Sequence, residues 1–128
     1  MNGNTRASTV PAAIIARLKA IVGPAGYLEA AGDVEPYCRS WRDNWVGDVP
    51  LVLRPNSTAE VAEIVRLCAG ARVPIVPQGG NTGLTGASQP HDDRTEVVVS
   101  TSRMKTIRAL DITDDTITVE AGVVLKDI

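Results

Sequence analysis

The stretch that decides the fold runs from Pro77 to Gly86 and reads PQGGNTGLTG. It directly follows the apolar run VPIV at residues 73–76, and its glycines stand at positions 79, 80, 83 and 86. Glycine loses more backbone freedom on folding than any other residue, so a cluster of glycines is costly unless the backbone must turn sharply or touch something closely. A glycine cluster directly after a buried strand therefore favours a ligand-binding loop over a tight turn without a ligand, which is the alternative interpretation.

Two common phosphate-binding patterns do not fit this loop. A dinucleotide fingerprint needs G-x-G-x-x-G at the start of a helix, whereas residues 86–95 are polar and contain Pro90, which predicts no helix there. A P-loop needs a lysine directly after the glycines, but the next lysine in the chain is Lys105.

What remains is a loop that binds an anion through its own backbone N–H groups. Residues of mixed handedness turn consecutive N–H groups inward and form an anion-binding nest, and glycine lets a bulky phosphate approach the main chain. Four polar side chains add donors without adding charge: Asn81, Thr82, Thr85 and Ser88. A neutral set of donors suits a pyrophosphate that must be held without reacting.

The sequence around the loop predicts an α+β fold. Ser57 and Glu60 match a capping box, and Val61, Ile64, Val65 and Cys68 follow at helical spacing, so a helix is expected from Ser57 to Gly70 with these four residues buried. Strands are expected at 51–54 and 73–76, which gives a compact βαβ unit with a covered parallel sheet. Further strands are expected at 96–100 and 116–121, and in the second of these Ile117, Val119 and Ala121 should point inward. An N-terminal helix is expected at 10–22 and an irregular segment at 23–50. A new helix is expected to begin in the final residues.

Composition bounds the class of protein. The chain has 128 residues, 44% of them apolar and 3% aromatic, with a net charge of −2, which argues against a nucleic-acid surface or a polybasic membrane anchor. No apolar run reaches the ~20 residues of a membrane span, and the N-terminus indicates an amphipathic helix rather than a signal peptide. Cys38 and Cys68 are expected to be reduced thiols, although a disulfide stays open, and we expect a cytoplasmic location.

Several motifs together resemble a known family. The loop PQGGNTGLTGAS, then VVVSTSRMK and TITVEAGVVL, and before them YCRSWRDNWVGDVPLVLRPNSTAEVAEIVRLC, are similar to the flavin domain of the vanillyl-alcohol oxidase / p-cresol methylhydroxylase (PCMH) superfamily. The branch of FAD-linked D-2-hydroxyacid dehydrogenases, which includes D-2-hydroxyglutarate dehydrogenase, D-lactate dehydrogenase and the glycolate oxidase catalytic subunit, resembles the chain most. The resemblance implies that residues 37–128 are the first part of a PCMH-type FAD-binding domain, with 1–36 as a lead-in and the substrate domain absent.

The resemblance also implies which residues contact FAD. The cofactor residues would be Pro77, Gln78, Gly79, Gly80, Asn81, Thr82, Gly83, Gly86, Ser88, Ser100, Ala121 and Gly122. Ala121 and Gly122 would let the flavin pass close to the backbone. Relatives that attach FAD covalently often carry His where this chain has Asn81, so the FAD is expected to be non-covalent. We assign no catalytic residue to this chain.

The implied activity is oxidation of a 2-hydroxyacid to a 2-oxoacid by hydride transfer to FAD, with an electron acceptor that the sequence does not identify; a homodimer stays open. Two alternatives remain: a non-catalytic nucleotide- or partner-binding module, and a superfamily enzyme acting on a sugar or an aromatic alcohol.

A few other residues attract attention. His91 beside Asp92 and Asp93 is interpreted as a solvated loop residue and not as a metal ligand, because a metal site usually needs three or four converging ligands. Trp41 and Trp45 are interpreted as anchors of the irregular segment, with an approach to the active site as the alternative. Arg103, Lys105 and Arg108 are interpreted as solvated charges in a loop.

Overall fold

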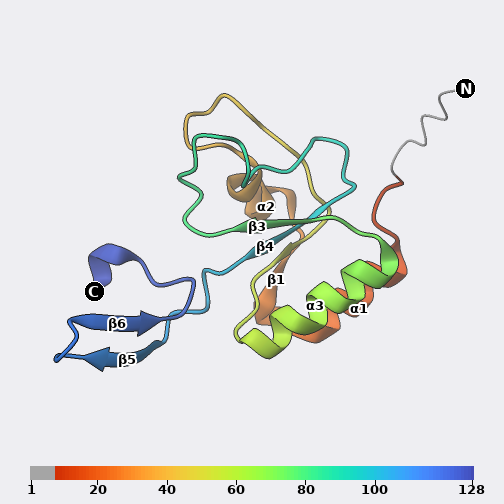
Figure 1. The fold of residues 1–128 in the computed structure, drawn as a ribbon. Coiled ribbons are helices and arrows are strands. Elements are labelled where there is room, and N and C mark those ends of the chain that lie inside the picture. Colours follow the sequence, from red (N-terminus) through yellow and green to blue (C-terminus); the bar gives the residue numbers. More distant parts are fainter. Residues whose placement is uncertain (1–7) are drawn as a thin grey trace, which may run out of the picture.

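The computed structural model describes residues 8–128 (Figure 1). Its first seven residues, part of the predicted lead-in 1–36, lie outside the described residues. The described elements are α1 (Ala12–Val22), β1 (Tyr27–Leu28), α2 (Ala31–Cys38), β2 (Val52–Leu53), α3 (Thr58–Ala71), β3 (Ile75–Gln78), β4 (Val97–Ser100), β5 (Ile107–Asp111) and β6 (Thr116–Val119), with 3-10 turns at Pro24–Gly26 and Leu125–Asp127. The predicted mixture of helices and strands is confirmed.

The main sheet has the strand order β1-β2-β4-β3. β2 and β3 are each parallel to β4, and β1 is antiparallel to β2. The predicted strand–helix–strand unit is present as β2-α3-β3, but β4 lies between its two strands. The carboxyl ends of three parallel strands therefore meet at one edge, where the glycine loop leaves β3.

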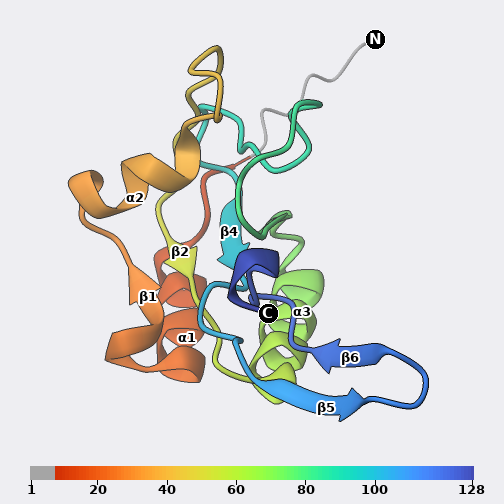
Figure 2. The same cartoon turned by 90° about the vertical axis from the view of Figure 1, so that its left-hand side faces the viewer.

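Both faces of this sheet are covered, as the continuous apolar strands predicted. Leu53 and Val99 face α1 and α3, whose buried residues include Leu18 and Ile64. On the opposite face, Val52, Val76 and Val98 pack with Val34 and Cys38 of α2. Figure 2 shows α1 and α3 side by side, with α2 set apart from them. The alternation of the two sets along each strand follows the period of two.

α3 begins as predicted and ends later than predicted. The Ser57 hydroxyl accepts from Glu60 N at 3.2 Å, while the Glu60 carboxylate reaches one residue further back, to Asn56 N at 2.7 Å. The helix runs past Gly70 to a left-handed cap at Arg72 (φ 56°). Val65 is exposed, so its place in the predicted buried stripe is wrong, because the stripe at the contact with α1 is narrower than the apolar pattern.

The prediction that 23–50 is irregular is wrong. The segment contains β1 and the helix α2, which continues through Pro36. Val34 and Cys38, one turn apart, are buried against the sheet. This burial outweighs the hydrogen bond that proline removes, since Gly32, whose carbonyl is left free, is exposed and can bind water.

The C-terminal part forms a separate antiparallel hairpin of β5 and β6, which projects from the body (Figure 2). The sequence missed β5, because its residues are exposed throughout and show no burial pattern. β6 stops at Val119, and Ala121 is exposed rather than inward. The predicted terminal helix is represented by the 3-10 turn Leu125–Asp127. None of the helices in residues 8–128 has the length and hydropathy needed to cross a bilayer.

Candidate cofactor-binding site

The glycine loop, residues 79–88, offers a row of free donors. Within residues 8–128, no backbone N–H of this loop donates a hydrogen bond to another protein group. All of its residues are exposed except Asn81 and Ser88, which are half-buried. Exposed N–H groups without protein partners are available to a ligand or to water.

Most glycines of the loop are not explained by the protein's own packing. A Cβ added at Gly79 or Gly80 would meet nothing within 4 Å, and one at Gly83 would meet only Ser88 Oγ at 3.7 Å. Of the four glycines, Gly86 alone has a positive φ, +81°. Three positions are therefore small without a conformational or packing reason, which leaves close approach of a ligand to the backbone as the remaining use of glycine.

Gly122 is different. A Cβ there would lie 1.9 Å from Thr101 O and 2.7 Å from Met104 O, and its N–H donates to Met104 O at 2.8 Å. The adjacent Ala121 O accepts from Thr101 Oγ1 at 3.1 Å. Gly122 is therefore small because the backbone at Thr101 and Met104, between β4 and the β5–β6 hairpin, lies against it.

Asn81 holds the loop in shape. It adopts a left-handed conformation (φ 56°), and its Nδ2 donates to Arg39 O at 2.9 Å. Its Oδ1 accepts from Gln89 Nε2 at 2.6 Å and from Ser88 Oγ at 3.2 Å. The side-chain polar atoms of Asn81 and Ser88 thus bond to each other and to Arg39 and Gln89. Thr82 and Thr85 make no side-chain hydrogen bond within the described part of the chain.

Pro77 and Gln78 belong to β3 rather than to the loop, so the strand ends two residues later than predicted. Gln78 is 3% exposed, and its Nε2 donates to Tyr37 O at 2.8 Å and Ser88 O at 2.9 Å. Ser100 lies opposite Gln78 at the end of β4, is also buried, and accepts from Ser102 N at 3.3 Å. The Gln78 side chain thus connects the end of the loop at Ser88 to the strand from which the loop begins.

A second segment, residues 39–48, lies beside the glycine loop (Figure 1). Trp45 Nε1 donates to Pro90 O at 2.8 Å, and Asp48 N donates to His91 O at 2.8 Å. Gly47 has no room for a side chain, since a Cβ would lie 2.1 Å from Pro90 O. We call residues 39–48 the facing segment.

The facing segment and the glycine loop enclose an open cavity of about 220 Å³. Its lining residues are Ser40, Arg42, Asn44, Trp45, Gly83, Leu84, Thr85, Gly86 and Gln89. Gln89 also carries a buried Oε1 without a hydrogen-bond partner within the described residues. The sequence singled out the tryptophans but gave no signal that this segment would face the loop across a cavity.

The two tryptophans have different roles. Trp45 is anchored through its indole N–H, as predicted, and it also lines the cavity. The alternative, an approach to the active site, stays a prediction. Trp41 is 64% exposed, so the prediction that it is an anchor is wrong. The physical reason is the turn at residues 40–45, in which Ser40 Oγ accepts from Asn44 N and Trp45 N, both at 3.1 Å. This turn directs the two tryptophan rings differently.

The charges around the site are mostly paired. Asp43 and Glu35 form ion pairs with Arg39 and raise its pKa. Arg103 is not simply solvated, because its Nη1 donates to Arg54 O at 3.0 Å, and Arg108 pairs with Glu120 at 3.2 Å. The interpretation as solvated loop charges is therefore wrong for Arg103, whereas Lys105 and Arg108 are exposed, as interpreted, with Arg108 on β5 rather than in a loop.

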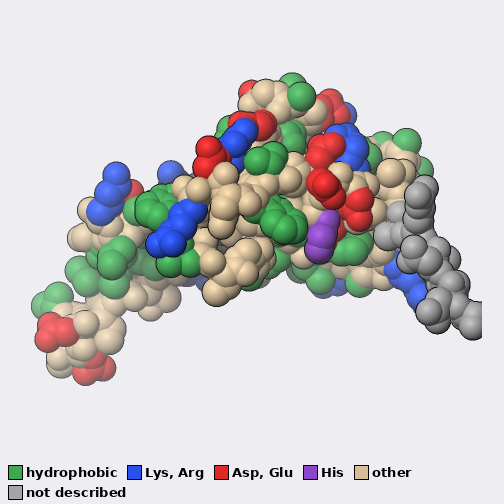
Figure 3. All heavy atoms as spheres, turned by 90° about the horizontal axis from the view of Figure 1, so that it is seen from above, with side chains coloured by type: hydrophobic (Ala, Val, Ile, Leu, Met, Phe, Trp, Pro, Cys, Tyr) green, Lys and Arg blue, Asp and Glu red, His purple; other side chains and the backbone are tan. Residues whose placement is uncertain are grey.

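His91 contacts the end of the facing segment: its ring lies edge-on to Trp45, with the ring centroids 6.3 Å apart, and its carbonyl accepts from Asp48 N. Its Nδ1 is 2.9 Å from Glu96 Oε1, and this contact raises the pKa of the imidazole. Acidic side chains gather beside it on the surface (Figure 3). Nowhere in residues 8–128 do three or more His, Cys, Asp or Glu side chains converge as metal ligands would.

Both cysteines are buried and free, as expected. Burial raises the pKa of the Cys38 and Cys68 thiols. Each thiol is therefore uncharged at neutral pH and acts as a packing group of the core.

The donor set fits the pyrophosphate of the FAD implied by the resemblance. The loop supplies unpartnered N–H groups, glycines with open space over the backbone, and the neutral hydroxyls of Thr82 and Thr85. These are the features of a backbone anion site.

Comparison with known sequences gives the same picture. The model of a family described as "FAD binding domain" matches residues 49–128. A protein of Oryza sativa subsp. indica named as a mitochondrial D-2-hydroxyglutarate dehydrogenase is 38% identical over 114 residues, covering 89% of this chain and 20% of the relative. A protein of Schizosaccharomyces pombe named as a mitochondrial D-lactate dehydrogenase is 34% identical over 116 residues, covering 85% of this chain and 22% of the relative. The chain thus spans about a fifth of these relatives.

Solved structures share the fold. An alkyldihydroxyacetonephosphate synthase superposes with a TM-score of 0.78 at 23% identity, covering 95% of this chain and 24% of the other. A p-cresol methylhydroxylase with substrate bound superposes with a TM-score of 0.72 at 20% identity, covering 87% of this chain and 22% of the other.

Proposed function

The chain belongs to the FAD-binding domain family, and from this premise we propose that it forms the pyrophosphate-binding part of a flavin-dependent D-2-hydroxyacid dehydrogenase. The bound flavin would supply the oxidising power, taking a hydride from the substrate's α-carbon as the 2-hydroxyacid becomes a 2-oxoacid. The residues of this chain would bind and orient the cofactor.

The observation that carries the proposal is the glycine loop. Its N–H groups have no acceptor within residues 8–128, and Gly79, Gly80 and Gly83 are small without a reason in the protein's own packing. A pyrophosphate lying over the backbone of this loop would receive several charge-assisted hydrogen bonds, which are about twice as strong as neutral ones.

The substrate class rests on the relatives, which are named for D-2-hydroxyglutarate and D-lactate. We extend the proposal to short D-2-hydroxyacids in general and to the achiral 2-hydroxyacid glycolate. A cytoplasmic location stays a prediction, since both relatives described above are named as mitochondrial. The electron acceptor and a homodimer are equally open to experiment.

Non-covalent attachment of FAD is part of the proposal. Asn81 stands where covalently flavinylated relatives often carry His, and an amide cannot form that bond. Its side chain is held by Arg39 O, Gln89 and Ser88. In this position Asn81 supports the loop.

The test is an absorbance spectrum of the purified full-length protein before and after acid precipitation. A flavin band near ~450 nm that moves to the supernatant supports non-covalent FAD. Flavin in the pellet would contradict the role of Asn81. No flavin, even after incubation with FAD, would favour the non-catalytic binding module.

Substrate choice is tested with the flavin-loaded protein and an artificial electron acceptor. We expect reduction of the acceptor with D-2-hydroxyglutarate, D-lactate or glycolate, and none with the L-enantiomers of the first two. Activity confined to a sugar or an aromatic alcohol would refute the proposed substrate class and retain the flavin site.

A further inference from the structure

We propose that Arg42 supplies the positive charge of the cofactor site and binds the diphosphate of FAD from the facing segment, opposite the N–H groups of the glycine loop. The inference rests on the proposed function. It assigns to residues 39–48, which precede the matched family region at 49–128, a direct part in cofactor binding.

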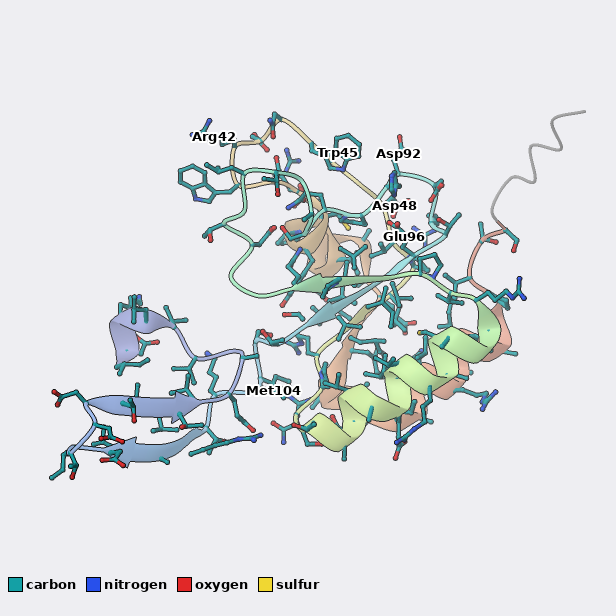
Figure 4. All side chains as sticks on the ribbon, in the orientation of Figure 1. Arg42, Trp45, Asp48, Asp92, Glu96 and Met104 are labelled. Atoms are coloured by element: carbon teal, nitrogen blue, oxygen red, sulfur yellow. The ribbon has the colours of Figure 1, made fainter. Side chains whose placement is uncertain are left out.

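The first support is position. Arg42 lines the cavity between the facing segment and the glycine loop, together with Gly83, Thr85 and Gly86. A ligand seated on the backbone of those three residues therefore lies in the same cavity as the Arg42 side chain. Figure 4 shows Arg42 on the loop that lies above the glycine loop in this view.

The second support is charge. Arg42 carries the only formal charge among the residues that line this cavity. It takes part in no ion pair or side-chain hydrogen bond within residues 8–128, whereas its neighbour Arg39 is held by Glu35 and Asp43. Asp43, the nearest acidic residue in sequence, is thereby occupied. A guanidinium without an ion-pair partner in the wall of a cavity that also exposes backbone N–H donors makes that cavity attractive to a dianion.

The third support is the fixed shape of the segment that carries Arg42. Ser40 N donates to Trp45 O at 2.9 Å, and Ser40 Oγ accepts from Asn44 N and Trp45 N. Two hydrogen bonds attach the turn to the rest of the site: Trp45 Nε1 donates to Pro90 O, and Asn81 Nδ2 donates to Arg39 O. Because these bonds hold the backbone that carries Arg42, binding has to order only the side chain of this residue, which lowers the entropic cost.

The experiment measures FAD affinity of the full-length protein and of three variants after removal of bound flavin. Arg42→Gln removes the charge, and Arg42→Lys keeps it without the guanidinium fork. Arg66→Gln is the matched control, because it removes the same charge from the exposed face of α3. Affinity is followed by quenching of flavin fluorescence at low and high salt, with riboflavin, which lacks phosphate, as the second ligand.

We expect Arg42→Gln to weaken FAD binding by about 5-fold to 30-fold and to reduce its salt dependence, which is the effect of losing one partly exposed charge-assisted contact. Arg42→Lys should retain part of the affinity, Arg66→Gln should retain all of it, and riboflavin binding should not change in any variant. Thermal unfolding of Arg42→Gln should match the parent, because Arg42 is exposed and unpaired within the described residues.

Two results would overturn the inference, and they differ. If the parent binds FAD while Arg42→Gln and Arg66→Gln bind it equally well, Arg42 has no part in binding and the proposed function stands. If the parent itself binds no FAD, both the proposed function and the role of Arg42 fall.

Discussion

Replacing Gly83 by alanine should separate cofactor binding from folding. Gly83 lines the cavity and has no positive φ, and its new Cβ would meet only Ser88 Oγ, at an ordinary 3.7 Å. The folded state should accept the methyl group, and the stiffer unfolded chain should raise the free energy of unfolding by up to about 1 kcal/mol. A phosphate oxygen hydrogen-bonds to a backbone N–H at about 2.9 Å, but a methyl carbon keeps it roughly 3.5 Å away.

The added methyl should therefore displace the ligand and break one charge-assisted hydrogen bond, which contributes about 1.5–3 kcal/mol. FAD affinity should fall by about 10-fold to 100-fold. The assays are flavin titration and urea unfolding of the full-length apoprotein. Gly70→Ala is the matched control, because a Cβ there meets nothing within 4 Å and lies on α3, outside the cavity. Unchanged FAD affinity in Gly83→Ala, or an unfolding loss above about 1 kcal/mol, would refute the argument that this glycine is small for the ligand's sake.

Three further predictions follow from the packing and the charges. Gly122→Ala should destabilise the protein by about 2–4 kcal/mol in urea unfolding, because a Cβ 1.9 Å from Thr101 O forces the backbone to shift; a neutral result would refute the tight joint. Gln78→Leu should cost about 2–3 kcal/mol in the same assay, since the carbonyls of Tyr37 and Ser88 lose their buried donor, and Ser88→Ala, which keeps its carbonyl, should cost less. Glu96 raises the pKa of His91, so the folded state binds the imidazole proton more tightly than the unfolded chain does. The difference in melting temperature between the parent and His91→Asn should therefore be full below about pH 6.5 and shrink as the pH rises through the raised pKa. A difference that grows with pH would contradict the His91–Glu96 pair.

The local sequence was sufficient to predict helices that begin with a capping box and strands that are apolar along their whole length. Ser57 with Glu60 marked the start of α3, and the apolar residues at 51–54 and 96–100 marked two parallel strands. The glycine loop could also be found from local sequence, because a cluster of glycines is recognisable without knowing what packs against it. Its neutral hydroxyl donors followed from that one stretch, and the resemblance to the FAD family followed from the stretch together with the motifs before and after it.

The helix α2 and the strand β5 could not be found in this way. α2 contains Pro36 and is stable because Val34 and Cys38 are buried against Val52 and Val98, residues far away in the chain. β5 is exposed throughout, so its pairing with β6 left no alternation to detect. In both elements contacts between distant residues outweigh the intrinsic preference of the local sequence.

For the site, the sequence by itself determined the chemistry and the tertiary structure decided the geometry. Four glycines with threonines predict a backbone anion site wherever the loop lies, because the prediction depends only on each residue's own N–H group and missing side chain. Only the fold could show that Asn81 and Ser88 are directed at the protein, that Gly122 is small for Thr101 O, and that Arg42 shares a cavity with the loop. Arg42 and Gly83 lie about forty residues apart in sequence, and their proximity depends on the hydrogen bonds from Trp45 to Pro90 and from Asn81 to Arg39, which form only when the sheet brings both segments to the same edge.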